Sequence, residues 1–413
     1  MTTSSTLYNA AFFNGPAGSD QVIDRALDAI RRHLGMPIAY ISEFVGNTSV
    51  FRHVDAPGLE DMIKVGDERS LDDVYCRHIV EGRLPELIPN TANNSIAAKM
   101  PITAAVPIGS HASIPIKLED GSVYGMFCCL SPEPNDSLNE RDLETMRMFA
   151  SLAADQIRRH HAATQTYNEK LDRIRQVITD QSYRIVYQPI VDLLSSRTVG
   201  YEALSRFDAS PARTPDLWFG EAEQVGLSQE LELDAIRRAL EATRRIDDGQ
   251  YISVNASPHL VCSAPFLELM AKAPLGQISL EVTEHAAVEN YETFQAVIEP
   301  LRKAGMKLAI DDAGAGHSSL RHILQLSPDF LKLDMSLTRN VDEDLSRRAL
   351  ISALVYYTRE TGSQIIAEGI ETEGELTMLK RLGVSRGQGY FLGRPSVDAI
   401  ETTRSNRKVL KEA

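Results

Sequence analysis

Polar side chains that can bind metal ions or catalyse reactions recur in the second half of the chain, each near the end of an apolar, strand-like run. In chain order they are Gln188, Glu202, Asn255, Glu281, Asp311, Lys332, Glu368 and Gln388. One polar residue in an apolar run is usually a satisfied buried group. A whole set at matching positions is harder to explain in that way, so we take these residues as the candidate site.

The carboxylates in this set predict a site for divalent metal ions. If the strands close into a barrel, their carboxyl ends meet at one mouth, which would gather Glu202, Asn255, Glu281, Asp311, Asp312 and Glu368. Carboxylates in a small space repel one another, which raises their pKa values. A bound divalent cation relieves this repulsion, and all-oxygen ligands favour Mg²⁺ or Mn²⁺ over Zn²⁺. The adjacent Asp311 and Asp312 would suit a pair of ions roughly 4 Å apart.

Paired hard cations favour hydrolysis of a phosphodiester, because they activate a water molecule and stabilise in-line displacement at phosphorus. Lys332 can hold or polarise the attacking water and offset charge in the transition state. Arg206, just beyond the second strand-like run, can clamp a phosphate. The ions would also attract an anionic substrate, so the protein needs no basic surface to bind one.

The elements that position these residues alternate between strands and helices. Strand-like runs are expected at 184–190, 198–204, 251–255, 277–282, 307–311, 330–333, 364–367 and 387–391. Such repeated alternation of strand and helix is typical of an α/β fold, the (β/α)8 TIM-like barrel. The link from Val191 to Thr198 is too short for a crossover helix, so the first strand should run antiparallel to the second.

The first half of the chain predicts a separate α+β module of about 140 residues. Helices are expected at 20–34 and 70–81, and strand-like runs at 38–45, 49–54, 86–89, 104–107, 111–118 and 122–130. A long helix at 139–180 joins the two parts, which predicts a first domain at residues 1–160 and a barrel at 161–413. This helix either pairs with a second copy in a dimer or packs one end on each domain, and both readings stay open.

Length, charge and cysteine content restrict the class of protein. The chain has 413 residues, with 43 Lys and Arg against 57 Asp and Glu, and its net charge is −14. This acidity argues against nucleic-acid polymers and membrane surfaces as partners. No run approaches the roughly 18 apolar residues of a membrane span, and residues 1–16 do not look like a secretory signal. The cysteines lack metal-binding spacing, which favours reduced thiols in a cytoplasmic protein.

The motifs around the candidate residues resemble, in order, those of the EAL phosphodiesterases. The stretch Tyr201-Glu-Ala-Leu-Ser-Arg206 matches the motif that names this family. The other matching blocks are Tyr187-Gln-Pro-Ile190, Val254-Asn255, Glu281-Val-Thr-Glu284, Asp311-Asp312, Lys332-Leu-Asp334, Ala367-Glu-Gly-Ile-Glu-Thr372 and Gln388-Gly-Tyr390. The resemblance implies a metal-dependent enzyme that hydrolyses cyclic di-GMP to linear pGpG with two divalent ions.

The resemblance also implies a role for each matching residue. The metal ligands would be Glu202, Asn255, Glu281, Asp311, Asp312 and Glu368. The catalytic residues would be Lys332, which contacts the attacking water, Glu202 and Glu368. The cyclic dinucleotide would contact Gln188, Leu204, Arg206, Asp334, Glu371 and Gln388. Glu284 would position the loop after the fifth strand, where family members often dimerise, so a homodimer is expected.

One position departs from the family pattern. Ala313 stands where the family usually has phenylalanine after the pair of aspartates, although every metal ligand is retained. This departure keeps a second reading open, in which the barrel binds cyclic di-GMP as a receptor without hydrolysing it. A third and weaker reading is an unrelated barrel metalloenzyme that acts on another phosphate ester.

The first domain resembles a GAF domain by its layout and by the stretches Tyr75-Cys-Arg-His-Ile79 and Leu87-Ile-Pro-Asn90. This resemblance implies regulation by an unidentified small ligand or signal. Cys76 and His78 could anchor a bilin through a thioether, but a buried structural thiol is the favoured reading. In the second half, Trp218 either stacks on a guanine or packs in the core.

Overall fold

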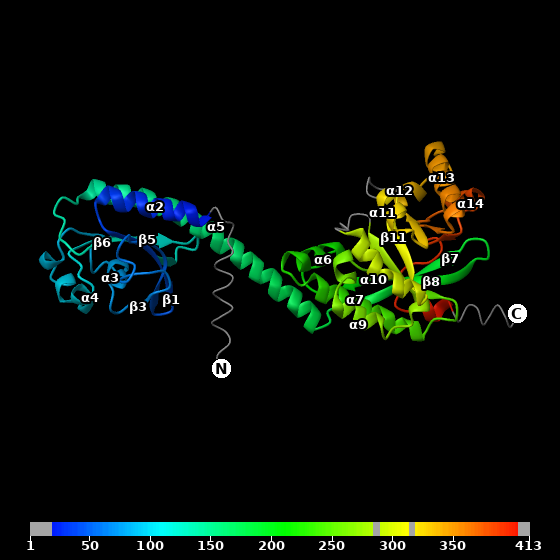
Figure 1. Ribbon diagram of the computed structural model, residues 1–413, viewed down its shortest axis with the longest axis horizontal. Helices are drawn as coiled ribbons and strands as arrows, with labels where there is room; N and C mark the ends of the chain where they lie inside the picture. Colours follow the sequence, from blue (N-terminus) through cyan, green and yellow to red (C-terminus); the bar gives the residue numbers. More distant parts are fainter. Residues whose placement is uncertain (1–18, 284–289, 314–318, 404–413) are drawn as a thin grey trace. The chain divides into compact units, whose positions relative to one another are not determined.

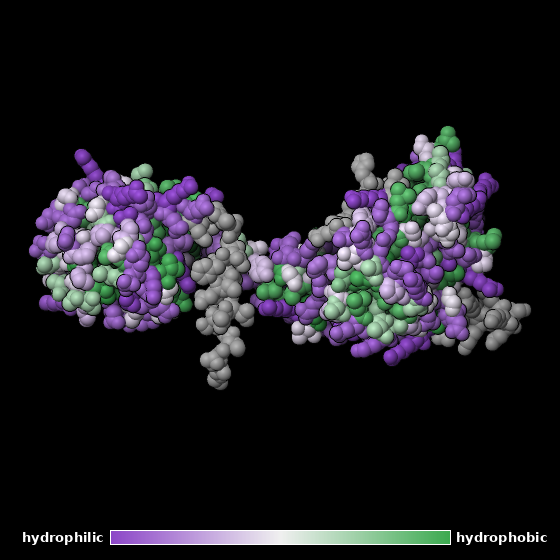
Figure 2. All heavy atoms as spheres, in the orientation of Figure 1, coloured by the Kyte–Doolittle hydropathy of each residue, from purple (hydrophilic) through white to green (hydrophobic). Residues whose placement is uncertain are grey.

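The computed structural model describes residues 19–283, 290–313 and 319–403 (Figure 1). The chain divides into two compact units at Thr166 and Tyr167. Within the described ranges, no helix is long and apolar enough to cross a membrane. The face drawn in Figure 2 is mainly hydrophilic on both units, with apolar side chains scattered over it. Scattered exposed apolar residues are normal for globular domains.

The first unit is built on an antiparallel sheet with the strand order β3-β2-β1-β6-β5-β4. Its strands are β1 (Ile38–Val45), β2 (Thr48–Asp55), β3 (Glu68–Ser70), β4 (Leu87–Ile88), β5 (Ser110–Lys117) and β6 (Val123–Ser131). The prediction of a strand at 104–107 is wrong. Residues 104 and 105 belong to the short helix α4 (Pro101–Ala105), and residues 106 and 107 follow it. Pro101 opens that helix, since proline fits the first helical turn.

Both faces of this sheet are covered, because strand residues alternate between them. On β1, Ala39 and Ile41 pack in a core with α2 (Ser19–Leu34) and α5 (Glu140–Thr179). Ile38 and Tyr40 pack in a second core with α3 (Tyr75–Val80) on the other face. Figure 1 shows α2 and the start of α5 lying together over the sheet.

Helix α5 is apolar at both ends and polar in the middle. Met146 and Ala153 are buried in the core of the first unit, whereas Ile174 and Val177 are buried in a core of the second unit. This burial agrees with the reading in which each end of the helix packs on one domain. Pairing of the helix in a dimer stays a prediction.

The second unit is a closed barrel with the strand order β10-β11-β12-β13-β14-β7-β8-β9. Its strands are β7 (Tyr183–Asp192), β8 (Arg197–Phe207), β9 (Tyr251–Asn255), β10 (Ile278–Thr283), β11 (Lys307–Ala313), β12 (Phe330–Leu333), β13 (Gln364–Ala367) and β14 (Arg386–Gly387). Strand β7 is antiparallel to both β8 and β14, and the other neighbouring pairs are parallel. This confirms the TIM-like barrel with a reversed first strand.

Helices connect most of these strands and pack against the barrel. They are α6 (Pro215–Gln224), α7 (Ser228–Leu240), α8 (Pro258–Val261), α9 (Ala264–Met270), α10 (Tyr291–Lys303), α11 (Ser319–Leu326), α12 (Met335–Thr338), α13 (Leu345–Thr361) and α14 (Glu373–Leu382). On β10, Leu280 and Val282 join the large core that includes Phe294 of α10. Trp218 of α6 is fully buried and stacks on Phe207, so its core reading is confirmed.

The last strand is shorter than expected, because β14 ends at Gly387 and the chain then turns toward the loop after β13. The Ile370 N–H donates to the Gln388 carbonyl at 3.1 Å, and the Phe391 N–H donates to the Ile370 carbonyl at 3.0 Å. Gly389 permits this approach, since a Cβ there would lie 2.2 Å from backbone atoms of Ile370. The turn holds Gln388 at the end of the barrel strands.

Candidate metal centre

The ammonium of Lys332 lies at the centre of the candidate site and contacts four carboxylates. Its Nζ is 2.8 Å from Glu281 Oε2 and from Glu368 Oε1, 3.1 Å from Asp311 Oδ1 and 3.4 Å from Glu202 Oε1. The Lys332 side chain is 1% exposed. The five groups come from β8, β10, β11, β12 and the end of β13, so barrel closure brings together residues that are far apart in the chain.

Local strand geometry aims these side chains into the barrel. Glu281 alternates with Leu280 and Val282, which face the outer core, so its carboxylate faces the opposite way. Strand β11 has one more residue than β12 between their paired positions, because Ile310 pairs with Leu331 and Ala313 with Leu333. Such a bulge commonly redirects side chains next to a functional site, and here it contains Asp311 and Asp312.

The charges in this cluster do not balance. Burial raises the pKa of Glu281 well above its usual value, and the nearby Glu202 and Asp311 add to that effect while Lys332 opposes it. Burial is also the main reason why the pKa of Glu368 rises to about 8. Burial alone would lower the pKa of Lys332, but the surrounding carboxylates raise it well above its usual value. One ammonium therefore faces four carboxylates and neutralises only part of their charge.

The residues fit a hard divalent cation. Ligand oxygens of Glu202, Glu281 and Asp311 all lie within 4.8 Å of one another. The amide oxygen of Gln388 is buried and has no hydrogen-bond partner among the described residues. Its amide nitrogen donates to the Glu202 carboxylate. An all-oxygen set with excess negative charge suits Mg²⁺ or Mn²⁺ better than Zn²⁺.

Asn255 links this cluster to a cavity of about 500 Å³. It ends β9 directly beside Glu281 in the strand register, and it also lines the cavity. Leu204 and Arg206 line the same cavity, together with Phe219 of α6. Its volume lies within the range of small-molecule sites in proteins. Three predicted site residues thus lie around a cavity of the size of a small-molecule site.

Three other predicted substrate residues have hydrogen-bond or ion-pair partners outside the cavity. Gln188 pairs with Glu202 in the register and donates to the Gly393 carbonyl at 3.2 Å. Asp334 caps α12 by accepting the Ser336 N–H at 2.9 Å. Glu371 is exposed and forms an ion pair of 2.8 Å with Arg339. None of the three is among the residues that line the cavity.

For two of the predicted site residues, the structure does not describe the side chain. Glu284 lies outside the described residues. The backbone of Asp312 belongs to β11, but its side chain lies outside the described part. Ala313 is 1% exposed and packs in the barrel core, so a phenylalanine there would need additional space.

Two supporting residues were missed from the sequence. Ser253 donates from its hydroxyl to Glu281 Oε1 at 2.5 Å, and its position two residues before Asn255 on a strand signals the shared face. Glu375 accepts the backbone N–H of Glu371 at 2.8 Å and of Asn340 at 3.0 Å. Thr372 and Glu375 form a capping box, a pattern that is readable from the sequence. Glu375 thereby joins the loops that follow β12 and β13.

Comparison with known proteins gives several relatives. A cyclic di-GMP phosphodiesterase of Pseudomonas aeruginosa is 28% identical over 309 residues, which are 68% of this chain and 51% of the relative. The bifunctional diguanylate cyclase/cyclic di-GMP phosphodiesterase MucR of the same species is 30% identical over 247 residues, 57% of this chain and 36% of that protein. This chain therefore spans about half, or less, of the length of these relatives.

Solved structures and family models agree with this likeness. The structure of the PaMucR phosphodiesterase in complex with c-di-GMP is similar with a TM-score of 0.51 and 29% identity, covering 55% of this chain and 97% of that one. The model of the GAF domain matches residues 17–158. The model of the EAL domain matches residues 171–395, more than half of the sequence. The chain therefore belongs to the EAL domain family.

Proposed function

We propose that this protein hydrolyses cyclic di-GMP to linear pGpG, with two Mg²⁺ or Mn²⁺ ions held at the mouth of the barrel. The observation that carries the proposal is the ring of four buried or nearly buried carboxylates around Lys332, next to a cavity of about 500 Å³. The relatives named as cyclic di-GMP phosphodiesterases support the choice of substrate.

The proposed metal ligands are Glu202, Asn255, Glu281, Asp311, Asp312 and Glu368. When bound, the ions supply positive charge to the scissile phosphate and activate the attacking water. Gln388 orients Glu202 through its amide, and Ser253 orients Glu281 through its hydroxyl. These hydrogen bonds keep the carboxylates in place before the ions arrive, which lowers the entropic cost of assembling the site.

The chain's own groups complete the proposed mechanism. Lys332, together with Glu202 and Glu368, acts at the reacting atoms, and its ammonium holds the attacking water and offsets charge in the transition state. Arg206 faces the cavity and pairs with a phosphate of the substrate. Leu204 provides an apolar contact beside it. Gln188, Asp334, Glu371 and Gln388 are the remaining proposed contacts with the dinucleotide.

Turnover of cyclic di-GMP by the purified chain tests this proposal. We expect conversion to pGpG, detected by chromatography, in Mg²⁺ or Mn²⁺ and none in EDTA. Glu281→Gln should lower the rate at least about 100-fold, because it removes one charge from the ion site. Glu299→Gln is the control, since Glu299 pairs with Lys303 on the exposed side of α10. Tight binding without product would instead favour a receptor, and cleavage of a simple phosphodiester alone would favour an unrelated hydrolase.

We further propose that residues 1–160 form a regulatory domain for the barrel at 161–413, and that the protein is a homodimer. Met148 and Leu152 are 70% and 56% exposed and lie one helical turn apart on α5. Two exposed apolar side chains on one face of a helix suit contact with a second copy. Light scattering should report a dimer for the wild type and a monomer for Met148→Glu combined with Leu152→Glu. A monomeric wild type, or a dimeric variant, would contradict this assembly.

A further inference from the structure

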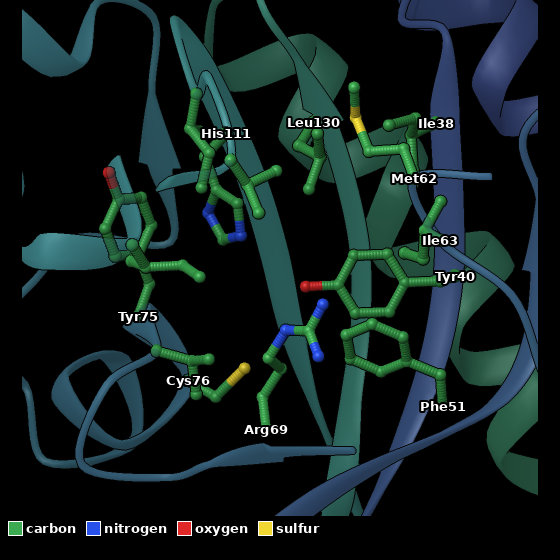
Figure 3. Close-up of a pocket in the computed structure, with 14 residues that line it drawn as sticks. Ile38, Tyr40, Phe51, Met62, Ile63, Arg69, Tyr75, Cys76, His111 and Leu130 are labelled. Carbon is green, nitrogen blue, oxygen red and sulfur yellow. The ribbon is translucent and has the colours of Figure 1, made fainter. Parts of the chain in front are cut away.

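The first unit contains a cavity that the barrel chemistry does not use. It lies between the sheet and the segments around α3 and α4, and its lining includes Tyr40, Arg69, Tyr75, Cys76 and His111 (Figure 3). Most of the other lining residues are apolar, among them Ile63, Val106 and Ile108. Figure 3 shows the Arg69 guanidinium, the Tyr40 hydroxyl and the His111 ring directed toward the same space.

Among the residues that line this cavity, Arg69 carries the only fixed charge, and that charge is positive. Arg69 donates to the backbone carbonyl of Glu68 at 2.9 Å, and it forms no ion pair with any residue that the structure describes. None of the lining residues is acidic. A guanidinium has five N–H donors in a planar fork and stays charged. Arg69 is partly exposed and therefore retains donors for an oxyanion at the edge of a mostly apolar cavity.

His111 provides a second polar group. It is 2% exposed, and its Nδ1 is buried without a hydrogen-bond partner among the described residues. Its ring meets the Tyr75 ring edge-on, with 5.0 Å between the centroids, which limits its orientation. A buried polar atom left unpaired costs free energy. In one tautomer the Nδ1–H can donate to a ligand oxygen.

The cavity is small. The centre of a water molecule can occupy about 50 Å³ of it, against about 500 Å³ in the cavity that Asn255 lines. That space excludes a cyclic dinucleotide and a tetrapyrrole in this conformation. It suits a compact ligand with one charged head and a short apolar body.

We propose that this cavity binds a small organic acid whose carboxylate pairs with Arg69 and hydrogen-bonds to His111. The apolar part of the acid contacts Ile63, Val106 and Ile108. Arg69 supplies the charge that selects an anion, and the apolar walls favour an anion that carries an apolar group. The inference does not rest on the activity of the barrel, because binding alone tests it.

Calorimetric titration of the full chain tests the proposal with butyrate, 3-methylbutyrate, benzoate and phenylacetate, each compared with its neutral amide. At least one acid should bind, about tenfold or more tightly than its amide, because only the carboxylate forms charge-assisted bonds. Arg69→Met should reduce the affinity for that acid to that of the amide. Arg52→Met is the matched control, because Arg52 pairs with Glu43 and is not among the lining residues.

Three results would overturn the inference. They are no binding by any of the acids, equal binding of acid and amide, and unchanged affinity in a folded Arg69→Met variant. Circular dichroism checks that the variants fold. The comparison of acid with amide needs no variant, so it decides the matter even if Arg69→Met does not fold.

Discussion

Replacing Lys332 by methionine removes the charge at the centre of the site while keeping a side chain of similar length. In the metal-free protein, the change leaves four carboxylates, which lie 2.8 to 3.4 Å from the ammonium, without their shared cation. Removing one partner from a buried ion pair costs about 3–5 kcal/mol. That is a large part of the roughly 5–15 kcal/mol by which a typical domain is stable.

Metal ions should reverse much of this loss. A divalent cation replaces the missing positive charge, and a ligand at 100 times its dissociation constant stabilises the folded state by about 2.7 kcal/mol. Lys332→Met should therefore lose about 3–5 kcal/mol in EDTA and regain more stability on addition of Mn²⁺ than the wild type gains. Its rate of cyclic di-GMP hydrolysis should nevertheless stay low, since the group that we propose to hold the attacking water is gone.

The chain has a single tryptophan, and Trp218 is fully buried in the second unit. Urea titration followed by its fluorescence therefore reports unfolding of the barrel rather than of the first unit. Lys307→Met is the control, because Lys307 is 50% exposed and pairs with Asp329 at the surface, where an ion pair contributes at most about 1 kcal/mol. A loss below about 1 kcal/mol for Lys332→Met in EDTA, or a response to Mn²⁺ no larger than that of the wild type, would refute the reasoning.

Further outcomes follow from the supporting residues. The pKa of Glu375 is lowered, because backbone N–H donors from Glu371 and Asn340 outweigh the opposing effect of burial. A carboxylate with a lowered pKa stabilises the fold above its unfolded pKa and loses that contribution as the pH falls through the folded value. Glu375→Gln should thus cost about 1–3 kcal/mol at neutral pH and progressively less below pH 4.5, the usual pKa of the group. A urea-unfolding difference that is the same at every pH would argue against this role. Ala313→Phe should destabilise the barrel by about 1–3 kcal/mol through overpacking, and an unchanged thermal midpoint would contradict it. Gln388→Leu should weaken Mn²⁺ binding in calorimetry by about tenfold, whereas equal affinity would mean that the amide does not orient Glu202.

Several features of the fold could be predicted because they depend on local patterns. The short link after Val191 predicted an antiparallel first strand, and the repeated alternation of strands with helices predicted a barrel; the structure has both. The positions of Glu281 and Asp311 near strand ends, and of Glu202 where β8 stops pairing with β9, placed them at one mouth once the barrel was assumed. The predicted end of the last strand, at residue 391, was wrong. Hydrogen bonds between residues 388–391 and Ile370, which is distant in the sequence, end that strand at Gly387.

The sequence by itself determined which residue types lie at the carboxyl ends of the strands, and the order of its motifs determined the resemblance to one family. Only the tertiary structure decided that Lys332 contacts four carboxylates at once, and that Asn255 borders both the acidic cluster and a cavity. It also decided that Arg69 and His111, on different strands of the first unit, line one small cavity. The physical reason is that periodicity reports the face of a single element, whereas distances between elements depend on how the whole core packs.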